Sequence, residues 1–85
     1  MLLAMEYVYI LKCADGTYYT GHTNNLDDRI RRHNKAENTY TKSRRPVELI
    51  TYLAFSDKYK AFPFEKYLKS GAQLSFARFV PFTPF

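Results

Sequence analysis

The feature that most constrains this chain is a tight turn between two runs rich in aromatic and β-branched residues. The first run spans residues 7–13, the turn is Ala14-Asp15-Gly16, and the second run spans residues 17–21. An Asp-Gly pair between two such runs is a strong signal for a β-hairpin. The simplest interpretation is a structural hairpin whose tyrosines pack in a core.

The length of the loop decides whether Tyr9 and Tyr19 lie on the same face of this hairpin. A two-residue loop, Asp15-Gly16, would place them on opposite faces, because one residue of slip inverts a strand. A three-residue loop with Gly16 in the left-handed conformation instead pairs Tyr9 with Gly21. We predict the three-residue loop, which makes the two tyrosines diagonal neighbours. Gly21 would then let another group or a ligand approach the sheet closely.

The rest of the chain alternates helix and strand signals. Asn24 or Asn25 can cap a short helix over residues 26–33, and alternating apolar residues predict a strand over 47–55. A second helix follows from residue 56 or 57 to 69 or 70, where Gly71 ends it. Pro63 falls inside this helix, and we predict a continuous but kinked element.

This order of elements predicts an α+β fold, a small three-stranded antiparallel sheet flanked by helices in the order ββαβα. The first strand is largely apolar on both faces, which indicates a strand covered on both sides. Eighty-five residues allow one domain, assigned to 1–85. A Phe/Pro-rich tail begins at about residue 72. It could pack over the sheet edge, dock on a second copy to make a homo-oligomer, or stay partly loose.

Cysteine content and the first residues indicate the compartment. The single Cys13 excludes an internal disulfide and a cysteine zinc site. One unpaired thiol fits a reducing, cytoplasmic environment. The first six residues lack a basic segment and end in an acid, so we expect neither a signal peptide nor a membrane span.

Positive charge is concentrated in one segment. Residues 29–45 carry seven Lys and Arg residues and one acid, so this segment is more positive than the whole chain, whose net charge is +5. Such a patch on a near-neutral domain indicates a polyanionic partner, most simply DNA, and the alternative is a solvated face that aids solubility. The hydroxyls of Thr39, Tyr40, Thr41 and Ser43 suit phosphate contacts. The residues of this segment predicted to bind nucleic acid are Arg31, Arg32, Lys35, Lys42, Ser43, Arg44 and Arg45.

The helix over residues 26–33 carries a candidate site wall. Leu26 and Ile30 form its apolar stripe, and Arg29 and His33 lie four residues apart along the edge of that stripe. A cation beside a buried face, after a hairpin lined with tyrosines, suggests a binding site. The alternative is an arginine that extends its charged end into water from a surface helix.

At these residues the chain resembles the GIY-YIG nuclease family. The first signature of the family corresponds to Tyr7-Val8-Tyr9, with tyrosine in place of the usual glycine, and the second to Tyr19-Thr20-Gly21. Arg29 follows at the usual interval, and Glu65 matches the metal-binding acid of the family. The resemblance extends from about residue 5 to about residue 71. Within the family, the chain resembles most the small single-domain bacterial proteins of unassigned role.

The resemblance implies a metal-dependent endonuclease acting on DNA, structure-selective or non-specific, with DNA repair or recombination as its setting. Tyr9 and Tyr19 would flank the attacking water, and one of them, as a phenolate, would act as base. Arg29 would bind the scissile phosphate. Glu65 would hold a single Mg²⁺ or Mn²⁺ ion. His33 would be a further catalytic residue and His22 a further nucleic-acid contact.

Two other functions stay open beside the endonuclease. Many family members carry a site asparagine after the glutamate, whereas every asparagine of this chain precedes Glu65. That departure favours a catalytically weak or inactive module that binds nucleic acid. An interaction protein that works through its Phe-rich tail is the third possibility. Without the resemblance, Glu65 would be read as an exposed helix acid paired with Lys69 four residues on.

Overall fold

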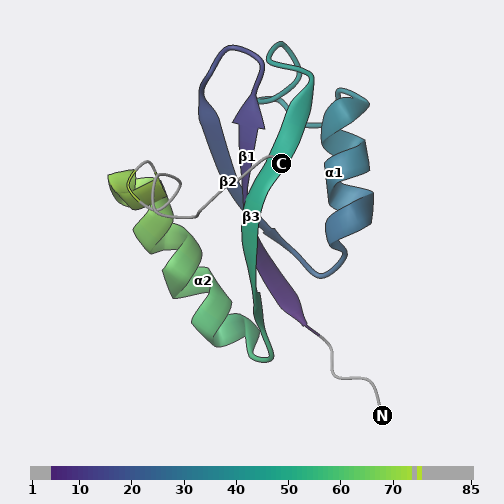
Figure 1. Cartoon of the computed structure of the whole chain (residues 1–85). Helices are drawn as coiled ribbons and strands as arrows, with labels where there is room; N and C mark the ends of the chain where they lie inside the picture. Colours follow the sequence, from purple (N-terminus) through teal and green to yellow (C-terminus); the bar gives the residue numbers. More distant parts are fainter. Residues whose placement is uncertain (1–4, 74, 76–85) are drawn as a thin grey trace, which may run out of the picture.

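The structure is a computed structural model that describes residues 5–73 and 75 (Figure 1). Three strands, β1 (Glu6–Cys13), β2 (Tyr18–Thr23) and β3 (Val47–Phe55), form one antiparallel sheet in the order β2-β1-β3. Helix α1 (Leu26–Asn34) joins β2 to β3, and helix α2 (Lys58–Tyr67) follows β3. The predicted α+β fold and the order ββαβα are confirmed.

The hairpin has the predicted three-residue loop. The Cys13 amide donates to the carbonyl of Thr17, and Gly16 has a φ of 87°, the left-handed conformation that glycine adopts without strain. Tyr9 consequently pairs with Gly21. Tyr9 and Tyr19 therefore share one face of the sheet, with ring centroids 6.3 Å apart.

The central strand β1 contributes to two separate apolar cores. On one face Val8 and Ile10 pack against the α2 side of the protein. On the other face Tyr9 and Leu11 pack among residues of the α1 side, including Ile30. Because side chains alternate along a strand, a single run of four buried residues supplies both cores. The expectation of a first strand covered on both sides is confirmed.

Helix α1 has the predicted start. The side chain of Asn25 accepts a hydrogen bond from the Asp28 amide at 3.2 Å, which satisfies one of the free donors at the helix N-terminus. At the other end the Asn34 carboxamide bonds the backbone of Val47 through both of its polar atoms. The end of α1 is therefore fixed to the first residue of β3.

Helix α2 runs through Pro63 without interruption. Proline leaves the carbonyl of Tyr59 without its helical donor, and Tyr59 is 73% exposed, so water can replace that bond. A π-helical segment, η1 (Leu68–Ala72), follows directly, and the residue with non-helical angles within it is Gly71, with a φ of 116°. The backbone therefore departs from the helix at the glycine predicted to end it.

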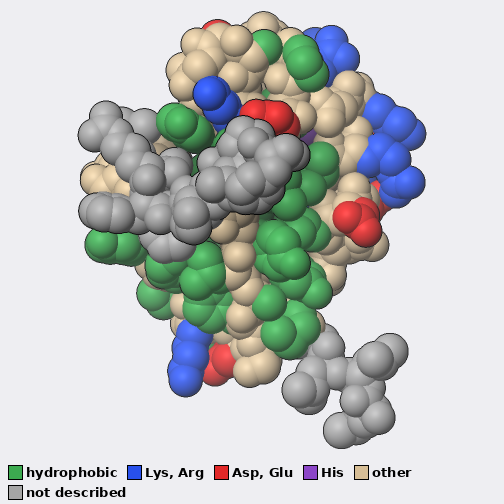
Figure 2. All heavy atoms as spheres, in the orientation of Figure 1, with side chains coloured by type: hydrophobic (Ala, Val, Ile, Leu, Met, Phe, Trp, Pro, Cys, Tyr) green, Lys and Arg blue, Asp and Glu red, His purple; other side chains and the backbone are tan. Residues whose placement is uncertain are grey.

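The Phe/Pro-rich tail, and with it the predicted homo-oligomer contact, lies almost entirely outside the described residues. Among the described residues, no helix has the length and the apolar character needed to cross a membrane. Figure 2 shows the Lys and Arg side chains gathered mainly beside α1 and around the loops at the same end of the sheet.

Candidate active site

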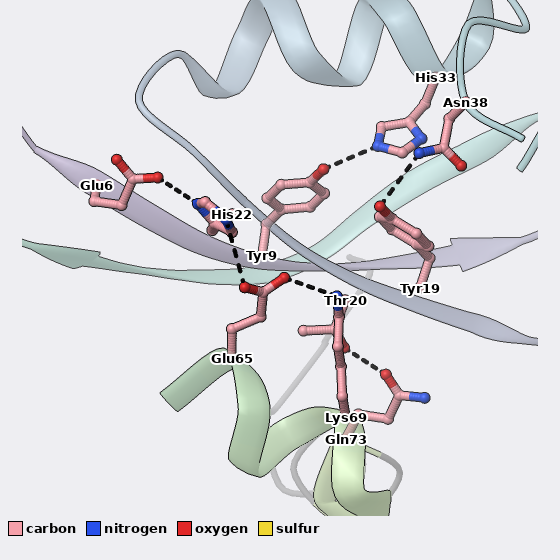
Figure 3. Close-up of polar contacts among 10 residues, drawn as sticks. All are labelled: Glu6, Tyr9, Tyr19, Thr20, His22, His33, Asn38, Glu65, Lys69 and Gln73. Carbon is pink, nitrogen blue, oxygen red and sulfur yellow. Dashed lines mark hydrogen bonds and ion pairs between the residues drawn. The ribbon is translucent and has the colours of Figure 1, made fainter. Parts of the chain in front are cut away.

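A buried polar cluster lies between the sheet and α1. The hydroxyl of Tyr9 is 2.9 Å from Nε2 of His33, and Nδ1 of His33 is 2.8 Å from Oγ1 of Thr41. Tyr9, His33 and Thr41 are all buried. The ring of Tyr19 packs edge-on against His33, with centroids 4.9 Å apart. Figure 3 shows both tyrosines directed from the sheet toward His33 and Asn38.

Gly21 is the residue that lets Tyr9 take this position. A Cβ atom at residue 21 would lie 2.5 Å from the hydroxyl oxygen of Tyr9, 2.7 Å from its Cζ and 3.0 Å from Cε1 of Tyr19. No side chain other than hydrogen fits there without displacing the tyrosine. The glycine of the second signature therefore serves close packing of the two phenols, as its pairing with Tyr9 predicts.

Burial sets the protonation states of the cluster. Desolvation, followed by the charge of Tyr19, raises the pKa of Tyr9 far above its usual value, although Arg29 acts in the opposite direction. Desolvation, followed by Arg29, lowers the pKa of His33. At neutral pH Tyr9 is therefore a phenol and His33 a neutral imidazole. A phenolate at Tyr9 is therefore disfavoured without a bound metal ion, because burial outweighs the nearby cation, and the choice of Tyr9 or Tyr19 as the base stays a prediction.

Arg29 lies beside this cluster on α1. Its guanidinium lowers the pKa of Tyr9 through a hydrogen bond and through its charge. The same charge lowers the pKa of His33. A cavity of about 120 Å³ opens at this position. Its lining residues are Arg29, Arg32, His33, Glu37 and Asn38. The edge of α1 therefore offers two guanidinium groups next to the tyrosine cluster.

The connection between α1 and β3, residues 35–46, is fixed to the hairpin turn. Arg44 bonds Asp15 at 3.0 Å, and the backbone carbonyl of Arg44 accepts from the Ala14 amide at 2.9 Å. The Arg44 guanidinium also lies over the ring of Tyr40, 4.1 Å from its centroid. These contacts hold the middle of the connection, which carries Thr41, against the sheet.

The predicted nucleic-acid contacts differ in how free they are. Arg31 and Arg32 both pair with Asp28. Arg44 and Arg45 donate to backbone carbonyls as well as facing solvent. The side chains of two lysines and one serine of the set are exposed and make no hydrogen bond or ion pair within the described part of the chain: Lys35, Lys42 and Ser43. Thr41, expected among the phosphate contacts, is fully buried and cannot serve as one.

Glu65 lies on the α2 side, apart from the hydrogen-bonded cluster. Its carboxylate is 2.9 Å from Nζ of Lys69 and 3.6 Å from Nε2 of His22 (Figure 3). His22 in turn bonds Glu6 at 2.6 Å, and its ring packs on Phe62. Glu65 nevertheless lies close enough to contribute to the raised pKa of Tyr9. The structure therefore brings Tyr9, Tyr19, Arg29 and His33 together, and places Glu65 and His22 in a neighbouring group.

The residues around Glu65 fit a lightly held, hydrated cation. No group of three His, Cys, Asp or Glu side chains suited to enclose a metal ion occurs among residues 5–73 and 75. A single carboxylate, completed by water and by substrate oxygens, is a usual way to hold Mg²⁺. The Lys69 ammonium already neutralises Glu65, so an incoming cation would have to displace it.

Asn38 and Gln73 were missed from the sequence, and the place of Thr41 inside the hydrogen-bond cluster was not predicted. Thr41 and Asn38 complete the hydrogen-bond cluster, and Asn38 donates to the Tyr19 hydroxyl at 3.2 Å. Gln73 accepts from Oγ1 of Thr20 on the α2 side (Figure 3). All three come from loops or helix ends, where no periodic pattern marks a residue as inward-facing. Asn38 lies three residues before Thr41, and asparagine side chains often bond the backbone of the residues that follow, which was the available signal.

Comparison with known proteins decides the family. Residues 5–74 match the GIY-YIG catalytic domain. The chain belongs to the GIY-YIG family. In this GIY-YIG domain, the first signature, Tyr7-Val8-Tyr9, lies in β1 and the second, Tyr19-Thr20-Gly21, lies beside it in β2.

Its relatives are small proteins whose names assign no activity. A UPF0213 protein of Pediococcus pentosaceus is 43% identical over 75 residues, which cover 87% of this chain and 79% of the relative. A UPF0213 protein of Clostridium perfringens is 48% identical over 66 residues, covering 76% and 71%. The solution NMR structure of a UPF0213 protein from Bacillus halodurans is 36% identical, with a TM-score of 0.56 over 89% of this chain and 82% of that one.

Proposed function

We propose that this GIY-YIG domain is a metal-dependent endonuclease that hydrolyses DNA phosphodiester bonds, structure-selectively or without sequence preference, in DNA repair or recombination. The observation that supports it most is the hydrogen bond between the Tyr9 hydroxyl and the buried, neutral His33. Of the two signature tyrosines, Tyr9 has a proton acceptor among the described side chains. Tyr19 instead receives a hydrogen bond from Asn38.

The chemistry begins with proton transfer from the attacking water. Tyr9 accepts a proton from the water while its own proton passes to Nε2 of His33. The water oxygen then forms a bond to phosphorus as the bond to the leaving oxygen breaks. This route avoids a free phenolate, which the raised pKa of Tyr9 disfavours. The leaving oxygen takes its proton from solvent, and His33, now an imidazolium, returns its extra proton to solvent through the Tyr9 hydroxyl, so that the site ends in its starting protonation state.

Arg29 binds the phosphate that is attacked and controls access to Tyr9. Tyr9 is fully buried when no substrate is bound, and the Arg29 guanidinium is one of the groups that act on its hydroxyl. A phosphate at the neighbouring cavity attracts this guanidinium, since charge-assisted bonds to phosphate are strong. The movement uncovers the Tyr9 oxygen when a substrate is present.

Glu65 would hold a single Mg²⁺ or Mn²⁺ ion. When bound, this ion neutralises charge on the phosphate and on the leaving oxygen. Glu65 is suited to it because its side chain is only 14% exposed and it is the acid near Tyr9 in charge range. Lys69 must release Glu65 for this, so the ion and the lysine compete for the carboxylate.

A DNA-binding module without cleavage is the second candidate. Two observations favour it: Glu65 is already paired with Lys69, and Tyr9 is fully buried. In that case the cluster around His33 is a structural core of the nuclease fold, and the exposed lysines beside it bind phosphates.

The test is cleavage of single-stranded, duplex and branched DNA with Mg²⁺, with Mn²⁺ and with a chelator. We expect cleavage of at least one form with a metal ion and none with chelator. Tyr9→Phe and Glu65→Gln should abolish it. Glu65→Gln should leave the affinity for DNA in chelator unchanged or higher, because a negative charge near the phosphate is removed.

Arg29→Ala distinguishes binding from chemistry. It should abolish cleavage and also weaken DNA binding, whereas Arg31→Ala, on the same helix but paired with Asp28, should do neither strongly. If Glu65→Gln cleaves as well as the parent, the metal assignment is wrong. If the parent cleaves no DNA form with either ion, the binding module is the better account.

A further inference from the structure

We propose that Asn38 and Thr41 are positioning residues that fix the direction of every hydrogen bond through His33, and so give Tyr9 and Tyr19 different roles. This inference rests on the proposed function for its catalytic meaning. Its structural content, the tautomer of His33, stands on the hydrogen bonds alone.

The direction is set first by the backbone. The amides of Tyr40 and Thr41 both donate to Oδ1 of Asn38, at 2.9 and 3.1 Å. A backbone N–H can only donate, so the oxygen of the Asn38 carboxamide must face these amides. Its Nδ2 group is then turned toward the Tyr19 hydroxyl, to which it donates at 3.2 Å. The oxygen and the nitrogen of the Asn38 carboxamide therefore cannot exchange places.

The Thr41 hydroxyl lies between Asn38 and His33 and contacts both. The Tyr9 hydroxyl is buried, and Nε2 of His33 is the acceptor that the described side chains offer to its hydrogen, so the ring proton of His33 lies on Nδ1. The Thr41 hydroxyl, whose other contact is Oδ1 of Asn38 at 3.4 Å, is oriented accordingly. Its contact with Nδ1 of His33, at 2.8 Å, must then be one in which the hydroxyl oxygen accepts. The Nε2 lone pair of His33 faces Tyr9, and the Tyr9 hydroxyl donates to it.

The two tyrosines differ as a result. Tyr9 gives its hydrogen to His33, so its oxygen keeps a lone pair, beside the one directed to Arg29, that can accept a proton from water. Tyr19 already accepts a hydrogen bond from Asn38, so its own hydrogen remains free to bond a phosphate oxygen or the water. The same two loop residues therefore make Tyr9 the proton-accepting tyrosine and Tyr19 the hydrogen-bond donor.

A purely structural role for Thr41 makes a different prediction. A buried threonine can serve only to fill space in the connection, and valine would then replace it without consequence for His33. The positioning role depends on the hydroxyl and not on the shape. Serine keeps the hydroxyl and valine keeps the shape, which makes the two variants a matched pair.

The experiment measures the tautomer of His33 by two-bond ¹⁵N–¹H correlations in NMR, at a pH where the ring is neutral. The parent should show the proton on Nδ1. Thr41→Val should populate the form protonated on Nε2, and Thr41→Ser should restore the parental pattern. Asn38→Asp should leave the tautomer unchanged, because a carboxylate oxygen still accepts from both backbone amides, while it removes the donor to Tyr19.

Cleavage supplies the second measurement. Thr41→Val should lower kcat by about tenfold with little change in KM, as expected for loss of one oriented hydrogen bond to a group that acts in the transition state. Thr41→Ser should recover most of the rate. Inactivity of the parent on all DNA forms would refute the proposed function, and the tautomer of His33 would still decide the positioning role.

One result overturns the inference without any variant. If His33 in the parent carries its proton on Nε2, the direction of the hydrogen bonds is opposite to the one derived. An unchanged Nδ1-protonated ring in Thr41→Val would also overturn it, since the ring would then not need the hydroxyl.

Discussion

Replacement of Gly21 by alanine tests the packing on which the candidate site depends. Gly21 does not have a left-handed φ, so alanine meets no backbone strain, and its cost comes from contact alone. The new Cβ would lie 2.5 Å from the Tyr9 hydroxyl oxygen and 2.7 Å from its Cζ. Since Tyr9 is fully buried, its ring cannot simply swing into solvent.

The magnitude follows from two costs and one gain. Overpacking a well-packed core costs about 1–3 kcal/mol. If the Tyr9 ring moves away from His33, a buried nitrogen loses its hydrogen-bond donor, which costs about 1–3 kcal/mol more. The smaller conformational freedom of the unfolded alanine variant returns only about 0.4–1 kcal/mol. We therefore expect Gly21→Ala to lower the free energy of unfolding by at least about 1–2 kcal/mol.

Thermal unfolding followed by circular dichroism measures this effect. For a domain of this size each kcal/mol shifts Tm by about 4–8 °C, so Tm should fall by about 5–15 °C and cleavage should be lost. Gly16→Ala is the matched control. It places alanine at a left-handed φ with no atom within 4 Å, so it should destabilise the turn without disturbing the tyrosines or abolishing cleavage.

A double-mutant cycle with Tyr9→Phe identifies the colliding group. Removing the hydroxyl removes the closest contact, although the one to Cζ remains. The double variant should therefore be more stable than the sum of the two single effects predicts, by about 0.5 kcal/mol or more. Strictly additive effects, or a Gly21→Ala variant as stable as the parent, would refute the argument that Gly21 exists to admit Tyr9.

Three further predictions concern pH, salt and the start of α1. Burial and a neighbouring guanidinium lower the pKa of His33, so at mildly acidic pH the unfolded chain binds a proton that the folded chain does not. The free energy of unfolding should therefore rise with pH up to the pKa of histidine in the unfolded chain, about 6.5. His33→Gln should flatten that rise. DNA binding should weaken steeply with salt, and Lys35→Ala and Lys42→Ala should each reduce the log–log slope by about one unit; binding that ignores salt would leave these lysines as solubility features. Asn25→Ala should cost about 1 kcal/mol through loss of the helix cap, whereas Asn24→Ala, one residue earlier, should cost little in the same unfolding assay.

The sequence predicted the hairpin register because turn chemistry is local. An Asp-Gly pair limits the loop geometries, and alternation along the strands then places Tyr9 and Tyr19 on one face. The strand over 47–55 was predicted at the right residues, but a register shift opposite Ile10 and Leu11 interrupts its period of two, so Val47 and Leu49 pack on the α1 side and Phe55 on the α2 side. The helix through Pro63 was predicted to be continuous but kinked, and it continues through the proline, whose missing donor leaves free a carbonyl that belongs to an exposed residue, Tyr59.

The polar part of the site could not be predicted in the same way. Thr41 lies in a connection whose composition is that of an exposed loop, yet it is fully buried against His33. Its burial depends on tethers to residues far away in the sequence, such as that of Arg44 to Asp15, which no periodicity reveals. Likewise, the desolvation that keeps Tyr9 protonated is a property of the packed fold and not of any motif.

The tether between Asp15 and Arg44 affects where this protein tolerates insertions. Exposed hairpin turns are usually the safest places to add a tag, a linker or a second domain. In this chain the turn at residues 14–16 also anchors the connection that carries Asn38 and Thr41. Lengthening it would release those residues from the tyrosines, although the sheet itself could still form. The turn between β3 and α2, at the other end of the sheet, carries no such tether among the described residues and is the better site for a fusion or a label.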